Sequence, residues 1–294
     1  MSQSSPVRVT RRGASRTRRW PLAGPTVVIW TTLFMLPVAL LFVFSFGKID
    51  ALTYKVSFGW TLNNYSKLLE PIYSAMLVRS LLIAIASALL CLLVGFPTAY
   101  YISRCEGRRQ QLLLLAVIVP FWVSFIVRTY AWVSLLRNGG PVEALLRQLH
   151  LGSGALDILY TPGSVMIGMV VNYLPLMILP LFVALERVEP SLEFAAADLG
   201  APPRRVLTRV VIPLATPGIV AGVLLVAIPA AGEYVVPAIL GGGKTVMFGN
   251  VIFDQFTKTG NYPFGAALAM VFIVFLMVVL WLARLVLGDR EDVV

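Results

Sequence analysis

Six long apolar runs constrain this chain more than any other feature of its sequence. Each run is close to the roughly 20 residues that an α-helix needs to cross the hydrocarbon core of a bilayer, and few charged residues interrupt the runs. An even number of crossings returns the chain to the side on which it starts. We therefore expect an all-α polytopic membrane protein with six transmembrane helices, at residues 26–46, 78–101, 112–136, 164–186, 217–240 and 266–287.

The composition excludes an ordinary soluble enzyme. Of the 294 residues, 58% are apolar and 13% are charged, whereas a soluble domain carries about 25% charged residues. The mean hydropathy of +0.84 exceeds what a globule of this size can bury in its own interior. One histidine, His150, and two cysteines, Cys91 and Cys105, are too few for a structural zinc or haem site or for His-based catalysis. We predict no metal site and no covalent chemistry.

The basic residues predict the orientation of the chain. The net charge is +10, but the basic patches interleaved with aromatics that nucleic-acid binding requires are absent, so we expect no nucleic-acid partner. Fifteen Lys and Arg residues fall on the side of the N-terminus and eight on the other side, and positive residues stay cytoplasmic. Residues 1–25 and 288–294 are thus expected to be cytoplasmic tails. A cleaved or twin-arginine signal is the alternative, disfavoured because the first run is too long and five more follow.

The connection 187–216, on the predicted cytoplasmic side, has the pattern of two short helices separated by a glycine. Apolar residues recur at i, i+3, i+4 and i+7 from Leu192 to Leu199. Gly200 follows at a position where a helix end usually needs a positive φ, and Pro203 suits the first turn of a second helix. The second helix is amphipathic, with arginines opposite its apolar face. This pattern fits the docking of another protein or, alternatively, an interfacial helix that touches lipid headgroups.

The segment from Glu193 to Pro213 resembles the EAA loop of ABC importer permeases. In that pattern Glu-Ala-Ala is followed by three residues and a Gly, then by nine residues and Ile-x-Leu-Pro, and the spacing to Gly200 and Pro213 matches. The family's Glu position holds Phe194, with Glu193 one residue earlier. The resemblance implies a coupling helix that docks in a groove of a cytoplasmic ATPase, and the departure predicts that Phe194 fills an apolar part of that groove. The residues assigned to ATPase coupling are Glu193, Phe194, Ala195, Ala196, Asp198, Gly200, Arg204, Arg205 and Pro213.

The resemblance covers residues 76–287, the five-helix core of the type I permease fold, and leaves 26–75 as a peripheral first helix and an outer loop. Within that family the chain is similar to the spermidine/putrescine permeases, which implies a polyamine or a similar small solute. The segments that carry this similarity are 128–132, 138–139, 232–237, 240–242, 249–252 and 261–265.

The resemblance also implies the partners and the location of the chain. It would act in a bacterial inner membrane, surrounded by lipid, with a second permease that is identical or homologous. An extracytoplasmic binding protein would deliver the substrate, and two ATPase subunits would bind ATP and Mg²⁺. This chain has no phosphate-binding motif, because the run Gly241-Gly242-Gly243-Lys244 lacks the required spacing. We therefore expect no cofactor on the chain itself.

Two charges, Arg128 and Glu233, fall inside the expected spans. An unpaired charge at mid-bilayer costs about 2.5–3.5 kcal/mol or more, and straight helices would place these two at similar depth. We expect either a static ion pair or a pathway in which Glu233 meets a cationic solute. The residues assigned to the translocation pathway are Arg128, Tyr130, Trp132, Glu233 and Tyr234.

Three other function classes compete with this interpretation. A permease for another small solute would share most of these motifs. A secondary transporter driven by an ion gradient would show an internal repeat and several intramembrane acids, and the sequence has neither. A membrane-embedded enzyme would need His pairs, Asp clusters or a Ser/Lys dyad, which are also missing. Gly218 and Gly222 at the start of the fifth run permit close helix packing, within this chain rather than between chains.

Overall fold

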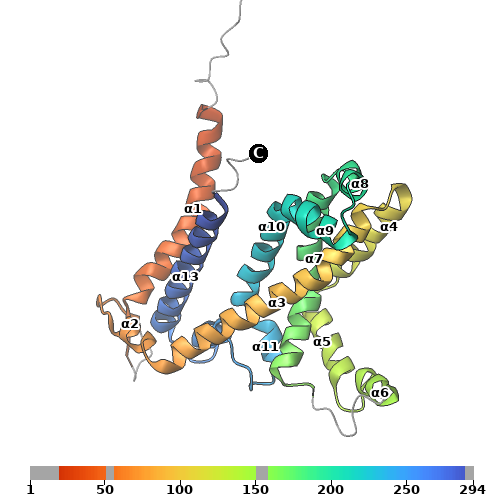
Figure 1. Ribbon diagram of the computed structural model, residues 1–294. Helices are drawn as coiled ribbons and strands as arrows, with labels where there is room; N and C mark the ends of the chain where they lie inside the picture. Colours follow the sequence, from red (N-terminus) through yellow and green to blue (C-terminus); the bar gives the residue numbers. More distant parts are fainter. Residues whose placement is uncertain (1–19, 51–55, 150–157, 289–294) are drawn as a thin grey trace, which may run out of the picture.

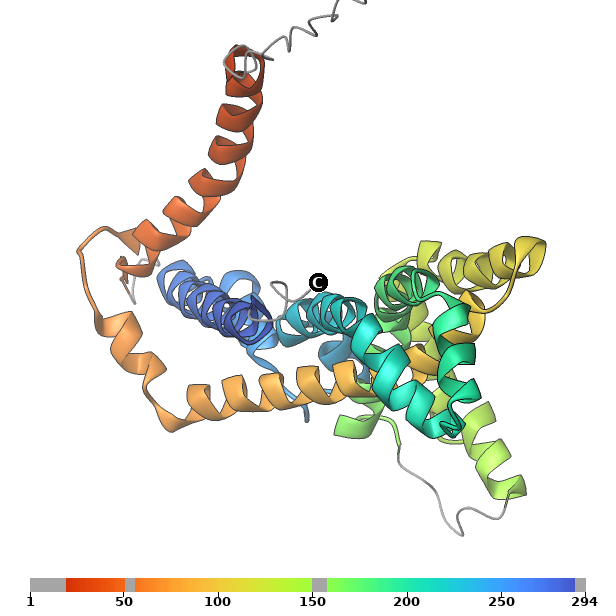
Figure 2. The ribbon, with the colours of Figure 1, turned by 45° about the horizontal axis from the view of Figure 1, so that its top comes forward.

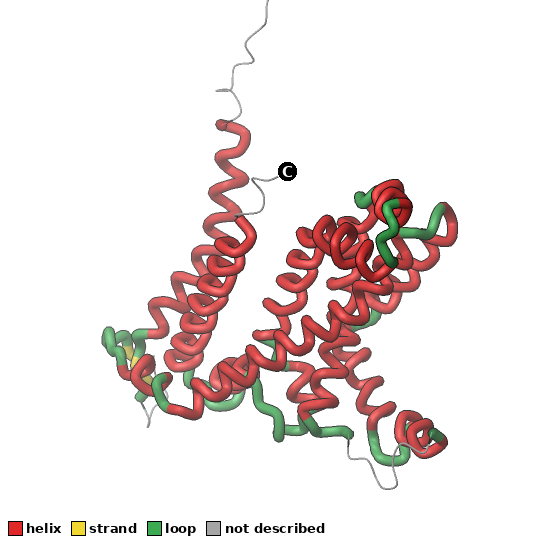
Figure 3. Tube along the Cα trace, in the orientation of Figure 1, coloured by secondary structure: helices red, strands yellow, loops and turns green. Residues whose placement is uncertain are grey.

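The computed structural model describes residues 20–50, 56–149 and 158–288. Most of the predicted basic tail, His150 and the C-terminal tail after residue 288 lie outside the described residues. The described chain is almost entirely helical, with one small antiparallel sheet of β1 (Lys48–Ile49) and β2 (Val56–Ser57) (Figure 3). The main helices are α1 (Trp20–Ser45), α2 (Asn63–Leu68), α3 (Pro71–Ser103), α4 (Gly107–Ile118), α5 (Phe125–Leu136), α6 (Pro141–Gln148), α7 (Pro162–Glu186), α8 (Pro190–Asp198), α9 (Pro203–Val206), α10 (Ile212–Ala231), α11 (Val235–Leu240), α12 (Phe248–Thr257) and α13 (Tyr262–Gly288).

The described residues accommodate the six expected membrane spans. Five helices are long and apolar enough to cross a bilayer, and a bent pair, Gly107–Trp122 with Phe125–Leu136, gives the sixth when the two halves are taken as one span. The start of α1, the end of α13 and the short helix α8 lie at the same end of the molecule (Figure 1). We call this end the coupling end, and the start of α3 lies at the opposite end.

The third span is not the straight helix expected from its apolar run. It bends by 92° between α4 and α5, where the 3₁₀ turn Val119–Trp122 is followed by extended backbone at Val123 and Ser124. Pro120 lies in this turn and has no N–H to continue an α-helical ladder. The expectation of one continuous helix was therefore wrong, since length and hydropathy do not register a turn inside an apolar run.

The fifth span is shifted toward the coupling end relative to the prediction. One helix runs from Pro203 to Ala231 through α9, a π turn at Leu207–Val211 and α10. The second amphipathic helix expected after Gly200 is thus the first part of the span. The helix ends at Gly232, and α11 begins separately at Val235, so the predicted end at residue 240 was wrong.

The core is formed by α3, α7 and α10, which pack on one another. Met169, Met177 and Leu181 of α7 lie fully buried among them. A Cβ on Gly218 would come within 2.3 Å of the Cβ of Ala184, and one on Gly222 within 2.7 Å of the Met177 sulfur. This close approach of α10 to α7 confirms that the two glycines serve packing within the chain.

The first helix stands outside this core, as Figures 1 and 2 show. It packs on α13, and residues 27–44 of its membrane-spanning part include no buried residue, whereas Ser45 at its end is fully buried. Its end is attached to the following loop by Asn64, whose side-chain amide donates hydrogen bonds to the carbonyl oxygens of Ser45 (2.8 Å) and Gly47 (2.9 Å). The apolar surface of α1 is thus left for lipid or for another chain.

Candidate functional site

The coupling end carries a short helix whose end is determined by a glycine. Helix α8 runs from Pro190 to Asp198, and Gly200 has φ +79° with nothing within 4 Å of a Cβ built there. In this conformation the Gly200 N–H donates to the Ala197 carbonyl (2.8 Å) and the Ala201 N–H donates to the Ala196 carbonyl (3.1 Å). A side chain at position 200 would be strained by the backbone itself and not by its neighbours. The predicted helix stop is confirmed.

Glu193 attaches α8 to the rest of the chain. Its carboxylate accepts a 2.6 Å hydrogen bond from the Tyr100 hydroxyl and forms an ion pair with Arg104, both near the end of α3. The Arg104 guanidinium also donates to the Leu185 carbonyl at the end of α7 (3.3 Å). One carboxylate thereby connects α8 with the ends of two core helices, so Glu193 has its partners within this chain.

The rest of α8 presents an apolar surface that the described chain does not cover. Phe194 is 69% exposed and Leu199 is 90% exposed, and Leu192 is exposed as well. Solvent-exposed apolar side chains this close together on a short helix are typical of a protein-binding surface. Of the residues assigned to coupling, Ala196 and Glu193 are partly buried, whereas Phe194, Ala195, Asp198, Gly200, Arg204, Arg205 and Pro213 are exposed.

A second candidate site lies at the opposite end, in a cavity of about 590 Å³ between α5, α11 and α12. Tyr130 of α5 and Tyr234, which precedes α11, both line it. The Tyr234 ring stacks on Phe253 of α12, with ring centroids 4.5 Å apart. Asn250 holds the same segment by donating from its side-chain amide to the Tyr234 carbonyl (2.7 Å). The cavity therefore has a wall of aromatic faces held in a defined position.

The charged groups of this cavity come from α12. Asp254 lines it and forms an ion pair with Lys258 one turn later (2.8 Å). Sequence reasoning missed α12, because it placed no helix between the expected spans 217–240 and 266–287. The signal was present, because Asn250, Phe253, Asp254 and Lys258 fall at i, i+3, i+4 and i+8 and so share one helical face.

Arg128 and Glu233 do not form the ion pair that straight helices would have allowed. The Glu233 carboxylate is buried, accepts a hydrogen bond from the Tyr173 hydroxyl and accepts the backbone N–H groups of Tyr234 (3.0 Å) and Val235 (2.8 Å). Glu233 therefore caps the break before α11. The Arg128 guanidinium lies over the Phe121 ring, 5.4 Å from its centroid.

Of the five residues assigned to the pathway, the structure brings Tyr130 and Tyr234 together at the cavity. Trp132 packs against the hydrophobic core instead. Arg128, Trp132 and Glu233 are not among the residues that line the cavity. The assumption of two straight helices, from which equal depth was derived, was wrong, because the third span bends before α5 and the fifth breaks after Ala231.

Comparison with known proteins agrees with this architecture. Residues 92–288 match the family described as binding-protein-dependent transport system inner membrane component. The chain is 36% identical over 271 residues to the Escherichia coli spermidine/putrescine transport system permease protein PotB, covering 91% of this chain and 98% of that protein.

Solved structures of a bacterial ABC transporter for the acidic polysaccharide alginate share its fold. One superposes with a TM-score of 0.70 at 15% identity, covering 93% of this chain and 96% of the other. A second, in complex with an alginate pentasaccharide-bound periplasmic protein, has a TM-score of 0.67 at 16% identity over 94% and 96% of the two chains.

Proposed function

The chain belongs to the family of binding-protein-dependent transport system inner membrane components, and on that premise we propose that it transports polyamines such as spermidine and putrescine, or a similar small cation. It is a multi-pass inner-membrane protein and the transmembrane subunit of an ABC importer, a transport subunit and not an enzyme. The observation that carries the choice of substrate is the 36% identity to a spermidine/putrescine permease along nearly the whole of both chains.

The cavity between α5, α11 and α12 supports a cationic substrate on chemical grounds. Ammonium groups bind to the faces of aromatic rings and to carboxylates, and the cavity offers Tyr130, Tyr234 and Phe253 beside Asp254. In the structure the Lys258 ammonium group forms an ion pair with the Asp254 carboxylate. An arriving ammonium group would take the place of Lys258, which lets the site release its cargo as well as bind it.

Coupling to ATP hydrolysis is assigned to α8. We expect the exposed apolar side chains around Phe194 to insert into a groove of an ATPase subunit, which would bind ATP and Mg²⁺. Because Glu193 connects α8 to the ends of α3 and α7, a movement of the docked helix would be transmitted to the core helices. In this proposal the coupling end, with the start of α1 and the end of α13, would face the cytoplasm, as the distribution of basic residues predicts.

Two further partners complete the proposed assembly. A second permease, identical or homologous, would cover part of the apolar surface of α1 and α13, since residues 27–44 include no buried residue within the chain. An extracytoplasmic binding protein would deliver the substrate at the end opposite α8. The alginate transporter structure that includes a periplasmic protein supports such a partner by analogy of fold.

Uptake by the reconstituted assembly tests the proposal. The chain would be coexpressed with its ATPase and second permease, placed in proteoliposomes with ATP inside, and supplied with a polyamine-loaded binding protein. We expect ATP-dependent uptake of labelled spermidine or putrescine. Asp254→Asn should lower uptake about tenfold, the loss expected when a cation loses one charge-assisted contact, with the ATPase still copurifying.

The control is Glu70→Gln, because Glu70 is an exposed acid near the start of α3 that does not line the cavity. Normal uptake in Asp254→Asn would show that the cavity is not the cation site. Uptake driven by an ion gradient without ATP would contradict the importer mechanism. ATP-dependent uptake of an anionic or neutral solute in place of polyamines would replace the proposed substrate.

A further inference from the structure

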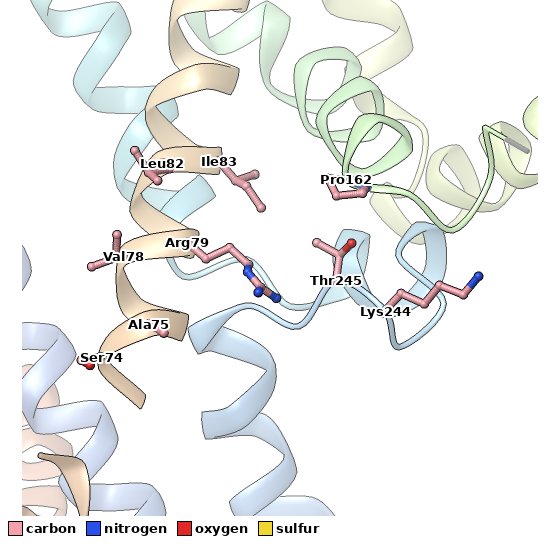
Figure 4. Close-up of a pocket in the computed structure, with 9 residues that line it drawn as sticks. All are labelled: Ser74, Ala75, Val78, Arg79, Leu82, Ile83, Pro162, Lys244 and Thr245. Atoms are coloured by element: carbon pink, nitrogen blue, oxygen red, sulfur yellow. The ribbon is translucent and has the colours of Figure 1, made fainter. Parts of the chain in front are cut away.

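A second cavity, of about 730 Å³, lies at the end opposite α8 on the other side of the segment 241–247 from the aromatic cavity. It is bordered by the first turns of α3, by the start of α7 at Pro162 and by Lys244 and Thr245, as Figure 4 shows. The two cavities share Thr245, so this segment separates them. No residue assigned to the pathway lines the second cavity.

The polar groups of this cavity suit an anion. Arg79 reaches from α3 toward the segment 241–247, and Thr245 lies between Arg79 and Lys244 (Figure 4). Thr245 is 97% buried, and its hydroxyl has no hydrogen-bond partner among the described residues. No acidic residue lines the cavity. A buried hydroxyl without a partner is unfavourable, and two cations without an acid add a net positive charge that an anion would neutralise.

The apolar groups beside these cations suit an acyl chain. Val78, Leu82, Ile85, Leu89 and Leu93 of α3 are all exposed, and their spacing of three and four residues places them along one stripe of the helix. The stripe starts at the cavity, which Val78 and Leu82 line together with Arg79. A cationic cavity therefore continues directly into an apolar surface along a membrane-spanning helix.

Arg79 lies near the end of the molecule opposite the coupling end. It is about 12 Å along α3 from Pro71, at 1.5 Å per residue. Helix α3 has 33 residues and is inclined to α1 and α13 (Figure 1), so its length exceeds the thickness of bilayer that it crosses. A long cationic side chain near the end of a membrane-spanning helix can extend to the headgroup region.

We propose that this cavity binds an anionic phospholipid from the leaflet opposite the coupling end. The phosphate would bind Arg79 and accept the Thr245 hydroxyl. Lys244, whose side chain points away from Arg79 in the structure (Figure 4), would turn toward the phosphate from the far side of Thr245. An acyl chain would follow the stripe from Val78 to Leu93. Lipid surrounds a membrane-spanning helix at high concentration, and the combination of cations with a long apolar stripe distinguishes a lipid from a free anion. By closing one face of the segment 241–247, the lipid would stabilise the wall of the aromatic cavity.

Thermal unfolding of the purified full-length chain in detergent tests this site. Phosphatidylglycerol should raise the melting temperature in a saturable way, whereas phosphatidylcholine and inorganic phosphate should not. Arg79→Gln with Lys244→Gln should weaken the phosphatidylglycerol response about tenfold or more, the loss expected for two charge-assisted contacts. The control is Arg137→Gln, which removes an exposed cation outside the cavity and should leave the response unchanged. Arg79→Lys, which keeps the charge, should retain most of the response.

Three outcomes would overturn the proposal. An equal response to phosphatidylcholine would show that the anionic headgroup is not recognised, and a response to inorganic phosphate alone would show a free-anion site. A double variant that loses the second permease on copurification, with its phosphatidylglycerol response intact, would assign the cavity to that subunit. If the double variant is not recovered folded, Arg79→Gln alone carries the same comparison. This test measures the melting temperature and not polyamine uptake. A failure of the lipid-site proposal can therefore be distinguished from a failure of the proposed transport function.

Discussion

Replacing Glu193 by alanine removes the side chain that attaches the coupling helix α8 to the core. The carboxylate accepts the Tyr100 hydroxyl and pairs with Arg104, while the neighbouring side chains Leu192 and Phe194 are exposed. Few other contacts hold this face of α8 against α3. We therefore expect local release of the helix in Glu193→Ala, with the membrane-spanning core intact.

The magnitude follows from the two bonds that are lost. A hydrogen bond to a charged group contributes about 1.5–3 kcal/mol, so two give about 3–6 kcal/mol of local stabilisation. The side chains of Arg104 and Glu193 are 21% and 17% exposed, and partial screening favours the lower end of that range. A loss of about 3 kcal/mol increases the open population of α8 by about a hundredfold, since each 1.4 kcal/mol is a factor of ten.

Hydrogen exchange read by mass spectrometry on the full-length chain measures this release. Amides of residues 192–199 should exchange about a hundredfold faster in Glu193→Ala, and peptides from α7 and α10 should be unchanged. Tyr100→Phe, which removes one of the two bonds, should give an intermediate increase. Glu189→Ala is the matched control, because Glu189 is an exposed acid just before α8 whose carboxylate bonds only to Ser191 among the described residues.

Equal exchange in Glu193→Ala and Glu189→Ala would refute the reasoning, because the ion pair would then contribute nothing to the position of α8. A double-mutant cycle with Arg104→Gln gives an independent check. The two substitutions should be non-additive, since either one already breaks the same contact.

Three further predictions concern the coupling helix α8, the turn that ends it and the cap of α11. Phe194→Ala should reduce copurification of the ATPase more than Glu193→Ala does, because Phe194 presents its ring to the docking partner; the reverse ranking would show that the position of α8, which Glu193 determines, matters more for docking than the Phe194 ring. Gly200→Ala and Gly260→Ala should each cost about 1–2 kcal/mol, because both glycines have positive φ in open space, but only Gly200→Ala should abolish the stimulation of ATP hydrolysis by loaded binding protein. Glu233→Ala should destabilise the chain by about 1–3 kcal/mol, since backbone N–H groups at the start of α11 lose their acceptor; an unchanged melting temperature would contradict that capping role.

Much of the architecture could be predicted because it depends on local chemistry. A single run of about 20 apolar residues in a bilayer can satisfy its own backbone hydrogen bonds only as a helix. The number of expected spans therefore followed from the apolar runs alone. The turn at Gly200 followed in the same way, since a positive φ is a property of one residue and its neighbours. The close packing at Gly218 and Gly222 was visible as a spacing within a single helix.

What only the tertiary structure decided depends on partners that lie far apart in the sequence. Glu233 was expected either to pair with Arg128 or to meet a cationic solute, yet its hydroxyl partner is Tyr173 on α7, and a break in the helix brings backbone N–H groups to the same carboxylate. Glu193 forms an ion pair with Arg104 and accepts a hydrogen bond from the Tyr100 hydroxyl, both near the end of α3. Hydropathy and periodicity indicate which faces of a segment are apolar and which are polar. They do not specify which helix ends lie next to each other in the fold. A buried or half-buried charge is satisfied by whichever polar groups the packing of several helices brings within hydrogen-bonding distance, and that distance exists only in the folded chain.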